Sequence, residues 1–117
     1  MPTKKREPSI QPQAAFDRIS LEDQELIKVR GEIDLFNGPL FRNAIAEAAQ
    51  AGRPVVIDMT GCTYLDSYCV NTLLQIAERP HLAVRVIAAS GSAAQRIFEL
   101  TGISRVVPLT YVDAPAP

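Results

Sequence analysis

The sequence predicts a single α/β domain built on a largely parallel sheet. Short apolar segments typical of strands alternate along the chain with segments whose apolar residues recur at helical spacing. Parallel neighbours need a crossover of about a dozen residues, which the intervening helices supply. The 117 residues can bury one core but are too few for two ordinary domains. We place the domain at residues 15–113 and expect disordered tails at residues 1–14 and 114–117, which are rich in proline.

A turn signal separates the first expected strand from the first expected helix. Apolar and polar residues alternate over residues 26–30, and the pattern resumes briefly at Ile33, which is typical of a strand. Residues 37–39, Asn-Gly-Pro, then mark a turn. Apolar residues follow at helical spacing until Gly52, a common helix stop: Leu40, Phe41, Ala44, Ile45, Ala48 and Ala49.

A continuous apolar triplet predicts the central strand of the sheet. Residues 55–57, Val-Val-Ile, follow Pro54 and are typical of a strand buried on both faces. The next residues, 58–63, are polar or small, so we expect a loop there. A second helix is expected over residues 70–77, with Pro80 closing the segment.

The last third of the sequence predicts a strand, a capped helix and a final strand. A strand is expected at residues 84–87, a turn with an N-cap at 90–92, a helix from 93 to a stop at Gly102, and a short strand at 106–111. The apolar positions of these patterns predict one core that includes Val55, Val56, Ile57, Leu73, Leu74, Val84, Val86, Ile97 and Phe98.

Composition excludes several classes of partner. The net charge of −1, with arginines scattered singly, gives no reason to expect nucleic-acid binding. No apolar run approaches the roughly 20 residues that cross a bilayer, so we expect a cytoplasmic protein without membrane insertion. Cys62 and Cys69 lie seven residues apart and the chain has one histidine. This set does not fit a zinc site, and no metal or other cofactor is implied.

Catalytic motifs are missing from the sequence. His81 stands in an expected loop with no neighbour to orient it as a base, so we interpret it as an exposed loop residue. The G-x-S-x-G elbow and the glycine-rich phosphate loops are absent, which argues against a hydrolase or a nucleotide enzyme. The remaining catalytic alternative is a small enzyme with Cys69 or Ser67 as nucleophile at a helix N-terminus. We expect that the protein is not an enzyme.

The most informative position is the start of the second helix, at Asp66 and Ser67. Either side chain could cap the helix by accepting a hydrogen bond from a first-turn N–H, which stabilises it by ~1 kcal/mol. Alternatively, a hydroxyl at a helix N-terminus is a favourable place for a phosphate. The residue types and their spacing favour the cap.

Three separated blocks resemble the STAS domain family, the anti-sigma-factor antagonists, across residues 19–111. Residues 31–34, GEID, are similar to the family's strand end "GELD". Residues 56–67, VIDMTGCTYLDS, are similar to its core "VLDLSGVTFLDS", and residues 94–103, AQRIFELTGI, to its third-helix block "VRRVLELTGL". The resemblance implies a STAS-like mixed, largely parallel β-sheet flanked by helices.

The resemblance also implies a function in bacterial signal transduction and transcription regulation. An antagonist of this family binds a serine-kinase anti-sigma factor, frees the sigma factor, and is released when a serine is phosphorylated. The implied partner is therefore a serine-kinase anti-sigma factor or a larger signalling assembly. The implied partner-binding surface includes Asp34, Asp66, Ser67, Tyr68 and Asn71. The oligomeric state is left open, a homodimer included.

Two departures from the family pattern affect this expectation. Tyr68 occupies the usual phosphoacceptor position, and Cys69 replaces a glycine. Ser67 is the substitute candidate for the phosphoacceptor, and Tyr68 is either a core residue turned inward or a bulky surface residue. The segment from Asp66 to Val84 is also about one helical turn shorter than is typical. Tyr68 favours the alternative of a non-phosphorylated STAS scaffold or transport-accessory subunit.

Overall fold

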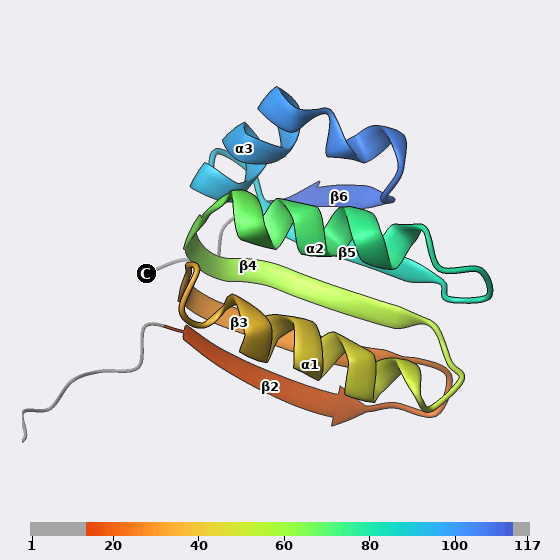
Figure 1. Ribbon diagram of the computed structural model, residues 1–117. Coiled ribbons are helices and arrows are strands. Elements are labelled where there is room, and N and C mark those ends of the chain that lie inside the picture. The colour runs from red at the N-terminus through yellow and green to blue at the C-terminus, as the bar shows by residue number, and fades with distance from the viewer. Residues whose placement is uncertain (1–13, 114–117) are drawn as a thin grey trace, which may run out of the picture.

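The computed structural model describes residues 14–113. The tails expected at residues 1–14 and 114–117 lie outside this range, apart from Ala14, which begins a strand. The elements are β2 (Ala14–Ser20), β3 (Glu25–Ile33), α1 (Gly38–Ala49), β4 (Val55–Leu65), α2 (Ser67–Ala77), β5 (Val84–Ala89), α3 (Ala93–Thr101), η1 (Ile103–Arg105) and β6 (Leu109–Val112). Figure 1 shows the sheet they form, in the order β2-β3-β4-β5-β6. Of the strands within residues 14–113, only β2 runs antiparallel to its neighbour, so the expected mixed, largely parallel α/β fold is confirmed.

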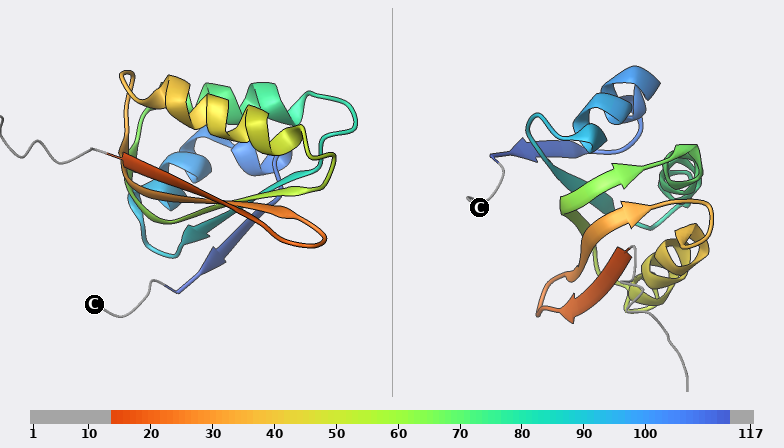
Figure 2. Two further views of the ribbon diagram at one scale, coloured as in Figure 1. Left: turned by 90° about the horizontal axis from the view of Figure 1, so that it is seen from below. Right: turned by 90° about the vertical axis from the view of Figure 1, so that its left-hand side faces the viewer.

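The helices lie on one face of the sheet. From β3 to β6 the strands follow one another in space as in the sequence, and right-handed crossovers between such strands place every connecting helix on the same side. Figure 2 shows α1 and α2 side by side over this face. One core cluster joins residues of all three helices to the inward side chains of the strands, with Phe41, Ile57, Leu73 and Phe98 among its buried members. No helix within the described residues is long and apolar enough to cross a membrane.

The predicted core is largely confirmed. Val55, Ile57, Leu73, Val86 and Phe98 belong to the buried cluster. Three other predicted members pack against the cluster but are only partly buried: Leu74, Val84 and Ile97. Val56 is buried but lies outside the cluster. It points to the opposite face of the sheet, because successive side chains of a strand alternate between faces.

The central strand β4 is much longer than the sequence predicts. The expected loop at residues 58–63 is wrong, because β4 continues through it to Leu65 alongside β3. The pairing of the two strands shifts register twice, between Lys28 and Arg30 and again between Gly31 and Glu32. These irregularities bury Met59, Cys62 and Leu65 at intervals of three rather than two. The period-two pattern that identifies strands is therefore absent from this segment.

The edge strand β2 was not predicted as a strand. It pairs with β3 from Ala14 opposite Gly31 to Ser20 opposite Glu25. Only its first three residues are even partly buried, so the apolar signal is weak. A buried carboxylate ties its other end to the rest of the domain.

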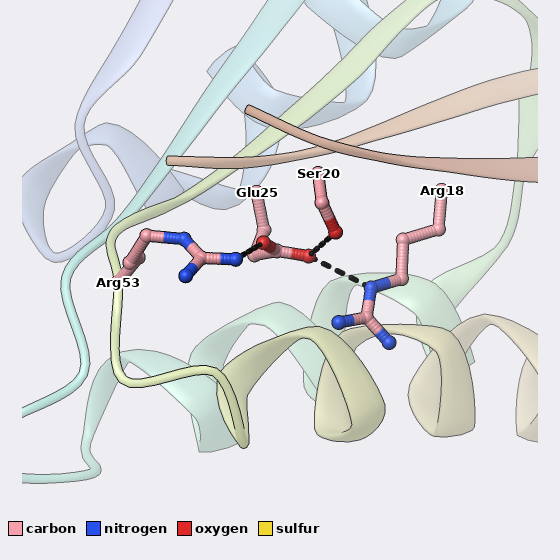
Figure 3. Close-up of polar contacts among 4 residues, drawn as sticks. All are labelled: Arg18, Ser20, Glu25 and Arg53. Carbon is pink, nitrogen blue, oxygen red and sulfur yellow. Dashed lines mark hydrogen bonds and ion pairs between the residues drawn. The ribbon is translucent and has the colours of Figure 1, made fainter. Parts of the chain in front are cut away.

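That carboxylate belongs to Glu25, whose side chain is 0% exposed. Figure 3 shows the side chains that surround it. Arg18 Nε and Ser20 Oγ donate to Glu25 Oε1 over 2.8 and 2.9 Å, and Arg53, from the connection between α1 and β4, donates to Oε2. The hydrogen bonds from Arg53 and Arg18 lower the pKa of Glu25 to about 2. The cluster thus joins three segments at the amino-terminal edge of the parallel strands.

The helix and strand boundaries agree with the predicted signals in part. Ser92 Oγ accepts from Gln95 N over 3.1 Å, and Gly102 ends α3 with a φ of 68°, as expected. Helix α1 begins at Gly38, inside the predicted turn, because proline is tolerated in the first helical turn. The last strand begins only at Leu109 rather than at residue 106.

Candidate protein-binding site at the start of α2

The ends of β3 and β4 bring the loop at residues 34–37 beside the start of α2. Ile33 and Leu65, the last residues of the two strands, are register partners, and Asp66 N donates to Ile33 O over 3.2 Å. The carboxyl ends of adjacent parallel strands carry the connections in which such folds place their binding sites. Residues far apart in sequence therefore meet here.

Asp66 is the N-cap of α2. Its Oδ1 accepts from Tyr68 N over 3.0 Å and from Cys69 N over 3.3 Å. The side chain thus supplies an acceptor for Tyr68 N in the first turn and a second acceptor for Cys69 N, which also donates to Asp66 O over 3.1 Å. The predicted cap is confirmed, with Asp66 as the capping side chain. Ser67 stands exposed as the first residue of the helix.

Asp34 organises the loop that it begins. Its Oδ1 accepts from Phe36 N over 2.9 Å and from Asn37 N over 3.1 Å. The Asn37 side chain bonds back to the backbone before the loop. Its Oδ1 accepts from Asp34 N over 2.8 Å, and its Nδ2 donates to Glu32 O over 2.8 Å. Gly38 N donates to Asp34 O over 2.8 Å. Side-chain acceptors of this kind fix tight turns, so the loop is held by bonds at both ends.

The Tyr68 side chain packs against the start of α1. A Cβ atom added at Gly38 would lie 2.6 Å from Tyr68 Cε1 and 3.3 Å from Cγ, so only a glycine allows the ring this close. Tyr68 is half-buried, and thus stands between the two alternatives of a core and a surface residue. Asn71 lies exposed about one turn further along α2.

Exposed apolar side chains near this site were missed by sequence reasoning. Phe36 is 88% exposed, Leu35 62% and Leu40 60%, and Tyr64 near the end of β4 is also exposed. Leu40 was expected on the buried side of its helix. An available signal was the pair Leu35-Phe36 between the turn residues Asp34 and Asn37, because such apolar residues rarely find burial in a short loop. We call Leu35, Phe36 and Leu40, which lie within six residues of one another, the apolar patch; Tyr64 lies on the open face of the sheet, because its neighbour Leu65 points into the core.

The cysteines and the histidine do not offer the chemistry of a nucleophilic enzyme. Cys69 is fully buried, and burial, with smaller contributions from Cys62 and Asp66, raises the pKa of its thiol. A reactive thiol needs the opposite shift. Burial likewise raises the pKa of Cys62 to about 11. His81 lies exposed in the loop after α2, as expected. Within residues 14–113, no three His, Cys, Asp or Glu side chains gather as a metal site requires.

The five-stranded mixed sheet with its three described helices defines a SpoIIAA-like α/β domain. The family model described as "Mlab, STAS domain" matches residues 18–110. The chain belongs to the STAS domain family. No characterised protein sequence matches the chain at a significant level.

Several solved structures are similar to this one. An anti-sigma factor antagonist from Mycobacterium paratuberculosis is 25% identical, with a TM-score of 0.76, over 83% of this chain and 85% of that protein. The unphosphorylated form of the anti-sigma factor antagonist SpoIIAA is 17% identical, with a TM-score of 0.66, over 84% of this chain and 88% of SpoIIAA. The phosphorylated SpoIIAA from Bacillus is 19% identical, with a TM-score of 0.57, over 84% and 91%. The two SpoIIAA similarities concern the fold.

Proposed function

We propose that this chain is a protein-binding regulatory module of the anti-sigma-factor-antagonist type, acting in the bacterial cytoplasm. Its partner is an anti-sigma factor of the serine-kinase type, and binding serves partner switching in transcription regulation. The observation that carries the proposal is the apolar patch exposed at the start of α1, which the contact of Tyr68 with Gly38 connects to the capped start of α2. Exposed aromatic and aliphatic side chains on a fixed loop are typical of protein interfaces. The similarity to the mycobacterial antagonist supports the same function.

The partner-binding surface that we propose comprises Asp34, Asp66, Ser67, Tyr68 and Asn71 with the apolar patch. Its parts lie on the connections after β3 and β4 and on the first turns of α1 and α2, and the hydrogen bond from Asp66 N to Ile33 O joins the two connections. Asp34 and Asp66 act mainly by fixing the backbone, because each accepts two backbone N–H groups. Ser67 and Asn71 contribute exposed polar atoms.

Phosphorylation of Ser67 does not control binding in this proposal. Tyr68 stands where the family has its acceptor serine, and its ring is fixed against Gly38. A phenol oxygen lies several bond lengths further from the backbone than a serine hydroxyl, so a serine kinase is poorly matched to it. This departure is the observation that favours the second candidate function, a non-phosphorylated STAS scaffold or transport-accessory subunit.

Affinity capture with the full-length chain, from cells of the organism that encodes it, tests the proposal. The captured partner is identified by mass spectrometry, purified and titrated against wild type, Ser67→Asp and Ser67→Ala. We expect an anti-sigma factor with a kinase-type domain, similar affinities for the three proteins, and no phosphate on Ser67 after incubation with the partner and ATP.

Two results would count against these statements separately. Stoichiometric phosphate on Ser67, absent from Ser67→Ala and matched by weak binding of Ser67→Asp, would show that the phosphorylation switch is retained. Capture of a partner that belongs to a membrane transport assembly would contradict the anti-sigma function and support the scaffold alternative.

A further inference from the structure

The loop at residues 34–37 combines high exposure with a fixed conformation. Phe36 is 88% exposed, yet its own N–H and that of Asn37 are held by Asp34. An aromatic side chain on a loop that is already ordered loses little conformational freedom on binding. Aromatic residues presented in this way are the usual energetic centres of protein interfaces.

The first turn of α2 supports this loop from the side. The ring of Tyr68 packs onto Gly38, the residue that follows the loop and donates its N–H to Asp34 O. The contact connects α2 to the start of α1 and leaves Gly38 buried. Removing the ring would open a space beside the hydrogen bond that closes the loop.

The charges around the loop restrict the partner. Asp34 and Asp66 carry the acidic groups of the two adjoining connections, and Glu32, near the end of β3, is exposed beside its register partner Tyr64. Of the nearest basic residues along the chain, Arg30 on β3 is already ion-paired with Asp17, and Arg42 lies further along α1. An apolar centre with an acidic surround complements an apolar pocket with a basic rim.

We infer that Phe36 is the anchor of the interface and inserts into an apolar, basic-rimmed pocket of a protein partner. Tyr68 is the positioning residue that keeps the loop in its binding conformation at all times. This inference rests on the proposed function and adds to it the contact residue, the partner's chemistry and the role of Tyr68. A fixed loop replaces the phosphorylation switch that the family places at this position.

Hydrogen exchange of the full-length chain tests the role of Tyr68 without any partner. In Tyr68→Ser, the amides of Phe36 and Asn37 should exchange at least about tenfold faster than in wild type, while that of Ile57 stays unchanged. Tyr68→Phe should exchange as wild type does, because the ring and not the hydroxyl makes the contact. If Tyr68→Ser does not fold, Gly38→Ala displaces the ring instead and should accelerate the same two amides. Unchanged exchange at Phe36 and Asn37 would overturn the positioning role.

Titration of the captured partner tests the anchor. Phe36→Ala should weaken binding by about thirtyfold or more, whereas Leu100→Ala, a control that is 79% exposed on α3, should bind within about twofold of wild type. Loss of binding in Leu100→Ala but not in Phe36→Ala would overturn the anchor and leave the proposed function standing. Failure of the wild-type chain to capture any protein would contradict the proposed function itself.

Discussion

Among the described carboxylates that accept hydrogen bonds, Asp66, Asp34 and Glu25 each hold a different connection in place. Asp66 caps α2, Asp34 closes the loop before α1, and Glu25 joins β2 to the connection after α1. Sequence reasoning identified the cap because aspartate before a helical pattern is a strong local signal. It assigned Asp34 only to a surface and missed Glu25, whose arginine partners come from segments 7 and 28 residues away.

Glu25 predicts a loss of stability in acid. Its pKa is lowered from 4.5 to about 2 in the folded protein, so the unfolded chain binds the proton more readily than the folded one. The contribution of the ionised Glu25 to the free energy of unfolding is complete above the pKa that this group has in the unfolded chain. It is lost as the pH falls through about 4.5 toward 2. Urea unfolding of wild type should show this decrease. Glu25→Gln should be less stable at pH 7 and should lack this part of the pH dependence.

The matched control for Glu25 is Asp17, which forms an exposed ion pair with Arg30. Asp17→Asn should leave both the stability at pH 7 and the acid dependence close to those of wild type. An acid dependence in Glu25→Gln as steep as in wild type would show that other groups are responsible.

The contact between Tyr68 and Gly38 predicts a strong coupling of two substitutions. Gly38→Ala should destabilise the wild type by ~1 to 3 kcal/mol, because the added Cβ meets the ring. In the Tyr68→Ala background the same change should be neutral or stabilising by up to about 1 kcal/mol, as alanine for glycine is in a helix. Chemical denaturation of the four proteins measures the coupling. Additive effects would mean that the ring does not occupy this place in solution.

At the scale of elements, the ends of helices were predicted better than the ends of strands. The cap at Ser92 and the stop at Gly102 follow from local chemistry that the sequence displays directly. The prediction ended β4 too early, because the register shifts between β3 and β4 remove the alternation of buried and exposed residues from residues 58–63. Strand β2 was missed because most of its residues are exposed, so its sequence carries little apolar alternation. Its strand conformation depends on the antiparallel pairing with β3.

The capping role of Asp66 gives a prediction for α2. Asp66→Ala should lower the free energy of unfolding by about 0.5 to 2 kcal/mol, because Tyr68 N loses its acceptor and Cys69 N keeps only the backbone oxygen of residue 66. Ser67→Ala, at the neighbouring exposed position, should change it by less than about 0.5 kcal/mol. Equal effects of the two substitutions would mean that Asp66 does not cap the helix in solution.

For the whole molecule, the alternation of strands and helices was enough to predict a largely parallel sheet. That all three helices share one face follows from the strand order, which no local pattern displays. The site was predicted in part, since Asp34, Asp66, Ser67, Tyr68 and Asn71 were named from a family resemblance. Phe36 was not, because its exposure depends on how two distant connections meet.

The single core that joins the sheet and its helices predicts large losses on truncation. Ile57→Ala and Phe98→Ala should each cost ~2 to 5 kcal/mol, because both side chains are fully buried in the cluster. Leu100→Ala on the same helix as Phe98 should cost less than about 0.5 kcal/mol. If Phe98→Ala lost so little stability in chemical denaturation, the conclusion that α3 packs into the core would be wrong.

The proposed function requires that this domain bind a protein through the connections at the ends of β3 and β4. NMR spectra of the isotope-labelled chain, recorded with and without its captured partner, test this most directly. We expect the largest amide shift changes in residues 32–40 and 64–71, while those of α3 and of open-face residues further along the sheet stay small. Changes confined to α3, or to open-face residues such as Lys28 and Thr60, would contradict it.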